Sequence, residues 1–166
     1  MKTRDKSLVK IIFSILNIFI SNDKKRAIFL NKIFSNLNIS DNVYIRKNVT
    51  FYGKGDLTIG QNSFINEECF LDISSKLIIK SYVSIGMRTV ILTSTHKIEK
   101  IRCGKVKRKI TIIEDNVWIG ANVLIYPGIT IGKGSVISAG EIIDINIPEN
   151  VLVKNGEHIP IYEDIK

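Results

Sequence analysis

The chain has 166 residues, a formal net charge of +8 and 45% apolar residues. That is about one domain's length and enough to bury a core, and its two cysteines do not make a disulfide framework. Isoleucine, asparagine and lysine dominate the composition. Branched side chains favour pleated surfaces and asparagine favours turns, so we expect many short strands joined by tight turns.

The first segment, residues 8–20, is strongly apolar. Its thirteen residues are too few to span a bilayer as a helix, and residues 21–23 offer no signal-peptide cleavage site. Polar side chains recur at helical spacing, at Lys10, Ser14, Asn17 and Ser21. We expect a helix covered by the protein's own body or by a sister subunit. The alternative is a peripheral contact with a membrane surface.

A second, short helix is predicted from Lys24 to about Leu37, with Ser21, Asn22 or Asp23 as its N-cap. Residues 1–38 are therefore expected to form an N-terminal helical segment. The main domain is expected at 39–150, followed by a C-terminal tail at 151–166.

From residue 39 onward the sequence has a period of six residues. Aliphatic or aromatic anchors stand at positions 39, 45, 51, 59, 65, 71, 79, 85 and 91, and then at 113, 119, 125, 131, 137 and 143. A strand alternates with period two and a helix with three and four, so neither explains this step. A triangular prism does, because each hexad supplies one short strand and one corner, and three hexads make one coil.

The period predicts an all-β solenoid of about five coils, at 39–58, 59–78, 79–96, 113–130 and 131–148. Most anchors are followed, four positions later, by a small or β-branched residue that should complete the inner layer. These residues are Val43, Val49, Ser63, Cys69, Ser75, Val83, Thr89, Thr95, Val117, Val123 and Ser135.

The repeat is interrupted at residues 97–112, and function is expected where regularity fails. Within 97–109 seven Lys and Arg residues stand against the single Glu99. This segment is either a solvated basic loop or a surface that attracts the phosphates of a cofactor or substrate. Because no nucleic-acid-binding motif accompanies the charge, we expect no nucleic-acid partner. His96 stands directly before the interruption, and histidine is suited to general-base catalysis near neutral pH. The alternative is a buried corner histidine.

Three strings around the interruption together resemble a known family. They are TSTH at 93–96, DNVWIGAN at 115–122 and YPGITIG at 126–132. Their succession resembles the hexapeptide-repeat O-acetyltransferases, especially the galactoside and maltose enzymes and those that acetylate sugars of capsules, O-antigens and exopolysaccharides. The likeness covers roughly residues 59–148. It implies a left-handed parallel β-helix, acetyl-CoA as co-substrate, and a homotrimer whose active sites lie between subunits.

The resemblance also implies roles for single residues. His96 would be the catalytic base that takes a proton from a sugar hydroxyl as the hydroxyl attacks the thioester. The backbone N–H of Ala121 would stabilise the resulting oxyanion. Ala139 would line the pantetheine channel, and Trp118 would form a wall of the same groove.

Acceptor and phosphate contacts are less regular. Asn66 and Asp72 would bind or orient the sugar, unless they are turn and corner residues. The family usually carries a cation at the end of the last hexad, but residues 141–146 read EIIDIN. Lys133, Lys154 or the basic loop would then hold the CoA phosphates. No metal site is predicted.

We therefore predict an acetyl-CoA-dependent O-acetyltransferase of a sugar hydroxyl, in cell-envelope polysaccharide biosynthesis. The acceptor would be a free, nucleotide-linked or lipid-linked sugar. We expect the enzyme in the cytoplasm, with residues 8–20 as a candidate contact with the inner membrane face. Two alternatives stay open: an amino-sugar N-acetyltransferase, which needs a base less strictly, and a non-catalytic β-helix scaffold.

Overall fold

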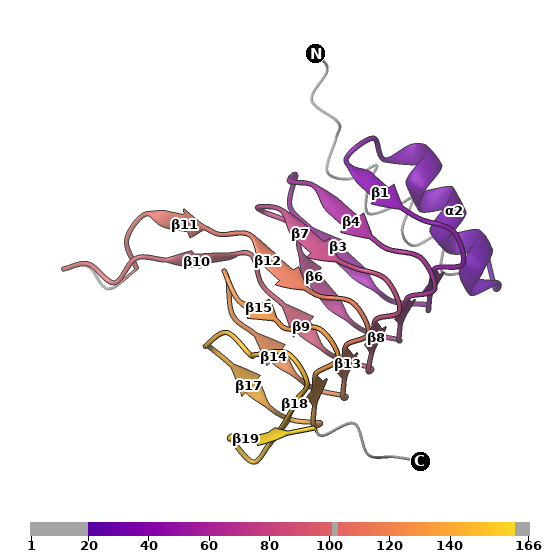
Figure 1. The fold of residues 1–166 in the computed structure, drawn as a ribbon. Helices are drawn as coiled ribbons and strands as arrows, with labels where there is room; N and C mark the ends of the chain where they lie inside the picture. The colour runs from indigo at the N-terminus through magenta and orange to yellow at the C-terminus, as the bar shows by residue number, and fades with distance from the viewer. Residues whose placement is uncertain (1–19, 101–102, 162–166) are drawn as a thin grey trace.

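A computed structural model describes residues 20–100 and 103–161 of the chain and shows a solenoid of short parallel strands (Figure 1). The first face consists of β1 (Leu37–Ile39), β4 (Leu57–Ile59), β7 (Leu77–Ile79), β12 (Thr111–Ile113) and β15 (Thr130–Ile131). The second consists of β2 (Tyr44–Ile45), β5 (Phe64–Ile65), β8 (Ser84–Ile85), β13 (Trp118–Ile119), β16 (Val136–Ile137) and β18 (Val151–Lys154). The third consists of β3 (Thr50–Tyr52), β6 (Phe70–Asp72), β9 (Val90–Ile91), β14 (Leu124–Ile125) and β17 (Ile142–Ile143). The predicted solenoid is confirmed, with five full coils and the start of a sixth.

The core is a set of stacked aliphatic ladders at the predicted anchor positions. In the second face, for example, Ile45 pairs with Ile65 and Ile65 with Ile85, and these side chains are at most 1% exposed. Fully burying such a side chain contributes about 1.5–3 kcal/mol. Cys69 is also buried in this layer, and burial raises the pKa of its thiol to about 11, so the group stays protonated.

The corners explain why asparagine is so common. Ten non-glycine residues in the described part of the chain have a positive φ, and seven of them are asparagines. Asparagine tolerates this left-handed conformation better than most residues do. One tight turn at each corner lets the next strand start on the next face of the prism.

The N-terminal end of the solenoid is covered by helix α2 (Asp23–Ile33). The side chain of Asn22 caps it by accepting a hydrogen bond of 3.0 Å from the backbone N–H of Lys25. The predicted C-terminal end at Leu37 is wrong, because the helix stops at Ile33 and Leu37 pairs with Leu57 as the first strand of the solenoid. Residues 8–19 of the helix predicted at 8–20 lie outside the described residues.

The interruption is an antiparallel hairpin of β10 (Ser94–His96) and β11 (Val106–Arg108). It leaves the solenoid after β9 and projects from one edge (Figure 1). Two details differ from the prediction. His96 belongs to the hairpin rather than to the third coil, and Thr95 is exposed instead of completing the inner layer. Thr93 and Thr111, which flank the hairpin, are fully buried instead.

Residues 151–160, expected as part of a tail, extend the solenoid. Strand β18 pairs in parallel with β16, and β19 (Glu157–Pro160) folds back against β18. The core continues into this end, since Val151 and Val153 are buried.

Candidate active site

One corner of the prism gathers several predicted site residues. From β5 on, the residue that follows the inward aliphatic residue of each second-face strand stands at the corner towards the third face, and these residues stack from coil to coil. This corner column consists of Asn66, Gly86, Gly120, Ser138 and Lys154, the last of them still within β18. Backbone hydrogen bonds of 2.8–3.0 Å fix the stacking, from the N–H of each of the first four to the carbonyl of the inward residue one coil further on.

The glycines of the column leave two backbone donors uncovered. A Cβ at Gly86 would lie 2.5 Å from the backbone nitrogen of Ala121, and one at Gly120 would lie 2.5 Å from that of Ala139. Within the described part of the chain, neither of these N–H groups donates a hydrogen bond. Unpaired N–H groups of this kind can stabilise a developing negative charge.

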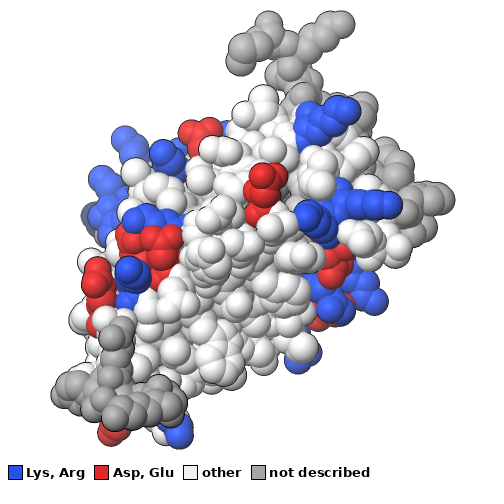
Figure 2. Space-filling view, turned by 45° about the vertical axis from the view of Figure 1, so that its right-hand side comes forward, with Lys and Arg blue, Asp and Glu red and all other residues white. Residues whose placement is uncertain are grey.

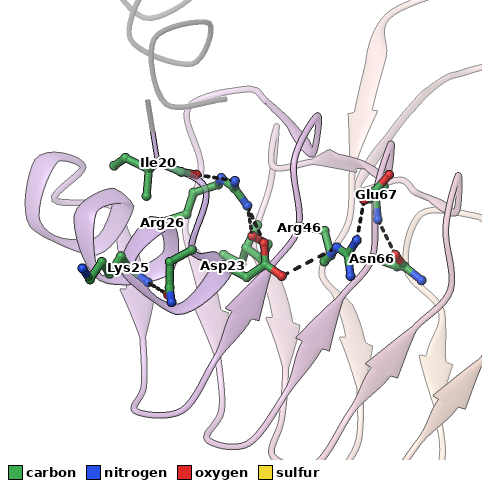
Figure 3. Close-up of polar contacts among 9 residues, drawn as sticks. Ile20, Asp23, Lys25, Arg26, Arg46, Asn66 and Glu67 are labelled. Carbon is green, nitrogen blue, oxygen red and sulfur yellow. Dashed lines mark hydrogen bonds and ion pairs between the residues drawn. The ribbon is translucent and has the colours of Figure 1, made fainter. Parts of the chain in front are cut away.

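The side chain of Asn66 has a fixed orientation. Its Oδ1 accepts a hydrogen bond of 2.8 Å from the backbone N–H of Glu67, which leaves the amide NH₂ group to donate to a ligand (Figure 3). A ligand atom facing Asn66 must therefore be an oxygen or another acceptor.

An ion-pair chain ties this corner to helix α2 (Figure 3). Arg46 bonds the carboxylate of Glu67 at 2.6 Å and lies 3.6 Å from that of Asp23. The hydrogen bond from Arg46 lowers the pKa of Glu67. Asp23 also pairs with the buried Arg26, whose guanidinium donates to the carbonyl oxygens of Ile45 and Ile20. The helix therefore braces the coil that lies beneath Asn66.

Asp72 is buried at the corner from which the hairpin leaves. Its Oδ1 accepts from the backbone N–H of Ser74 at 2.8 Å, and its Oδ2 from the N–H of Thr93 at 3.1 Å and the hydroxyl of Ser94 at 2.6 Å. Burial raises the pKa of this carboxyl, but the hydrogen bonds outweigh burial and the net pKa is lowered. This is the corner role that the sequence left as the alternative, and it anchors the start of β10.

His96 is exposed, two residues beyond Ser94. Its Nδ1 lies 2.9 Å from the carbonyl oxygen of Gly104 across the hairpin. Since a carbonyl only accepts hydrogen bonds, Nδ1 must carry the proton in this contact, and Nε2 of the neutral ring keeps its lone pair. The backbone of the hairpin thus selects the tautomer that a base requires. Nothing in the sequence indicated Gly104.

The chain does not bring all the predicted site residues together. Asn66, Ala121, Ala139 and Lys154 share one corner, whereas the hairpin with His96 leaves from the next corner, beyond the whole third face. Figure 1 shows the hairpin at the opposite edge of the solenoid from β8 and β13.

The other residues predicted to bind CoA also lie at different places on the solenoid. Trp118 lies on the second face beside the corner column and is 60% exposed. Lys133 is exposed but follows Gly132 at the third corner, away from both groups. Of the two predicted phosphate-binding lysines, only Lys154 stands in line with Ala121 and Ala139.

Two further findings concern the described ranges 20–100 and 103–161. They contain no cluster of three His, Cys, Asp or Glu side chains arranged to hold a metal. Nor is any helix within them both long and apolar enough to cross a membrane.

This geometry is that of a left-handed parallel β-helix with an inserted hairpin. Residues 110–144 match a family model described as the hexapeptide repeat of succinyl-transferase. The chain is 35% identical over 141 residues to a Schizosaccharomyces pombe protein provisionally named an acetyltransferase, covering 83% of this chain and 67% of the relative. It is 34% identical over 128 residues to a galactoside O-acetyltransferase of Lactococcus lactis, covering 74% of this chain and 60% of the relative.

A solved structure, a galactoside acetyltransferase in complex with coenzyme A, superposes with a TM-score of 0.75 at 26% identity. The match covers 92% of this chain and 80% of that one. The chain thus spans about two thirds or less of the two curated relatives but most of a solved fold. It belongs to the hexapeptide-repeat acetyltransferases, a family of acyltransferases.

Proposed function

We propose that this protein transfers an acetyl group from acetyl-CoA to a hydroxyl group of a sugar, with His96 as the general base. The observation that carries the proposal is the contact between Nδ1 of His96 and the carbonyl of Gly104, 2.9 Å apart. In the neutral ring this contact leaves the lone pair on Nε2, and the exposed side chain stands on a two-stranded support. The names of the relatives, galactoside O-acetyltransferases among them, support a sugar as the acceptor.

The reaction balances with the groups present. As the acceptor oxygen attacks the thioester carbonyl carbon, Nε2 of His96 takes the hydroxyl proton. The negative charge that develops on the carbonyl oxygen is stabilised by the unpaired N–H of Ala121. The C–S bond then breaks, the new ester is released, and the imidazolium returns its proton to the leaving thiolate to give CoA thiol.

The site is completed between subunits. His96 and Ala121 lie at different corners of one chain, so the hairpin of one subunit must reach the corner column of a neighbour. A cyclic trimer satisfies this requirement three times with identical contacts. Figure 2 shows an area without charged side chains across the lower middle of the visible surface, where a neighbouring subunit could pack.

The corner column also accounts for both substrates. Within residues 20–100 and 103–161 the NH₂ group of Asn66 has no hydrogen-bond partner, so it can donate to a sugar oxygen, at a level two coils below Ala121. Acetyl-CoA would extend from Ala121 in the opposite direction along the column, past Ala139 towards Lys154, whose ammonium group can contact a phosphate of CoA. The biosynthesis of a cell-envelope polysaccharide is the pathway that we propose for the acetylated sugar.

The test is a screen of acceptors with acetyl-CoA, with thiol release as the readout. Galactosides, maltose and nucleotide-linked sugars are compared with the matching 2-amino sugars, and products are identified by NMR. We expect acetyl esters on hydroxyl groups. Amide products alone would overturn O-acetylation, and no thiol release above the rate without acceptor would overturn the enzyme assignment.

A further inference from the structure

The hairpin has two chemically different faces. Strand register pairs His96 with Val106 and Thr95 with Lys107, and side chains at paired positions share a face. Backbone hydrogen bonds between Lys97 and Lys105, and between Gly104 and Lys97, continue the ribbon beyond His96. Alternation therefore places four lysines on the face opposite His96. This lysine face consists of Lys97, Lys105, Lys107 and Lys109.

The charge of the lysine face is not balanced. All four side chains are exposed, and none makes an ion pair within the described ranges. The backbone N–H of Lys97 bonds the carbonyl of Lys105, so the two cations lie on neighbouring strands, where like charges destabilise a hairpin. The carboxylate of Glu99 lies at the tip of the hairpin, over Gly104. An anionic ligand bound here would reduce the electrostatic repulsion among the four lysine ammonium groups.

The face has a fixed base on the solenoid. A Cβ at Gly128 would lie 2.4 Å from Cδ of Lys109, so the stem of this lysine packs over the glycine at the corner between β14 and β15. Lys105 and Lys107 follow outwards, at about 6.8 Å for every two residues. On the other face, Ser94 is held by Asp72 of the second coil. The base of the hairpin is therefore held to the solenoid on both faces, by Lys109 on one and by Ser94 on the other.

We propose that the lysine face binds a phosphate or diphosphate group of a substrate. Lysine ammonium groups at this spacing can contact neighbouring phosphoryl oxygens, and charge-assisted bonds of this kind are stronger than neutral ones. The face points away from His96, so it holds a remote part of the molecule and not the reacting hydroxyl. Its assignment to a substrate rests on the proposed function, and two sources share the chemistry: CoA itself and a phosphate-linked acceptor.

The test uses the full-length protein and titration calorimetry at low ionic strength, with inorganic pyrophosphate and CoA as probes. The variant is Lys105→Gln with Lys107→Gln, which leaves the packed stem of Lys109 in place. The matched control is Lys25→Gln with Lys32→Gln, because both residues are exposed on α2 and the loss of charge is the same. We expect pyrophosphate to bind the hairpin variant about tenfold more weakly than the control.

Each outcome is decisive. A parallel fall in CoA affinity, with pantetheine binding unchanged, supports the site and identifies the donor as its ligand. Loss of pyrophosphate binding with unchanged CoA affinity supports the site and identifies a phosphate-linked acceptor. Equal pyrophosphate binding by the two variants overturns the proposal. Because calorimetry needs no turnover, failure of acetyl transfer in the wild type would overturn the proposed function separately.

Discussion

Replacing Ala121 with proline tests the oxyanion donor with little disturbance of the fold. Proline lacks the N–H group, and in the described part of the chain the N–H of Ala121 has no hydrogen-bond partner to lose. The turn itself accepts proline. Asn122 follows Ala121 with a φ of 57°, and Pro127 occupies the equivalent turn position one corner later, followed by Gly128 with a φ of 86°.

The expected effect falls on the reaction and not on stability. Loss of one oxyanion donor reduces kcat by about 10²–10³, which corresponds to about 2.7–4 kcal/mol of transition-state stabilisation. A proline that fits its turn changes the free energy of unfolding by less than about 1 kcal/mol. The assay is steady-state thiol release, with urea unfolding as the check on the fold.

Ala121→Ser is the matched control, because serine keeps the N–H group and adds only a hydroxyl. We expect its kcat to stay within a few-fold of the wild type. A folded Ala121→Pro enzyme with the kcat of the serine variant would refute the assignment of this N–H to the oxyanion.

Three further changes probe the other parts of the site. Asp72→Asn should lower the free energy of unfolding at pH 7 by about 2–3 kcal/mol, since a buried carboxylate that accepts three side-chain or backbone bonds is lost. Because the pKa of Asp72 is lowered in the folded state, the stability advantage of the wild type over Asp72→Asn should be present at neutral pH and vanish as the pH falls from about 4 through that pKa. Urea unfolding at neutral pH and below that pKa measures the difference, with the exposed Asp41→Asn as the control. A difference in unfolding free energy that stays constant with pH would contradict the role of Asp72. Asn66→Asp should raise the KM of the acceptor about tenfold and more than Asn66→Ala does, because an anion replaces a donor; wild-type kinetics of the aspartate variant would show that the NH₂ group makes no contact. Mixing subunits of His96→Ala with subunits of Ala121→Pro, after unfolding and refolding together, should restore about a quarter of wild-type activity if each site takes one residue from each neighbour. No recovery in mixed trimers would place both residues in the same subunit's site.

The interior of the fold could be predicted from the sequence because it is repetitive. Each inward position of the prism recurs every six residues, so the period alone identified the buried ladder that includes Ile65, Ile85 and Ile119. The end of α2 could not be predicted in this way. Leu37 continues an apolar helical pattern, and only its pairing with Leu57 draws it into the first coil.

The sequence offered residue types for a site but little of their geometry. The interruption at 97–112 marked where His96 would stand, but not that a hairpin would carry it out of the coil. The carbonyl of Gly104 fixes the tautomer of His96 through a contact across the ribbon, which no sequence pattern encodes. For Asp72 the sequence left two roles open, orientation of the acceptor or a turn at the corner; its carboxylate is buried and holds the base of the hairpin.

The role of His96 is tested most directly by comparing the two histidines of the chain. His158 lies exposed on β19 and serves as the matched control. In a thiol-release assay with acetyl-CoA and an accepted sugar, we expect His96→Ala to lower kcat by about 10²–10⁴, and His158→Ala to leave it unchanged. Wild-type turnover by a folded His96→Ala enzyme would contradict the account.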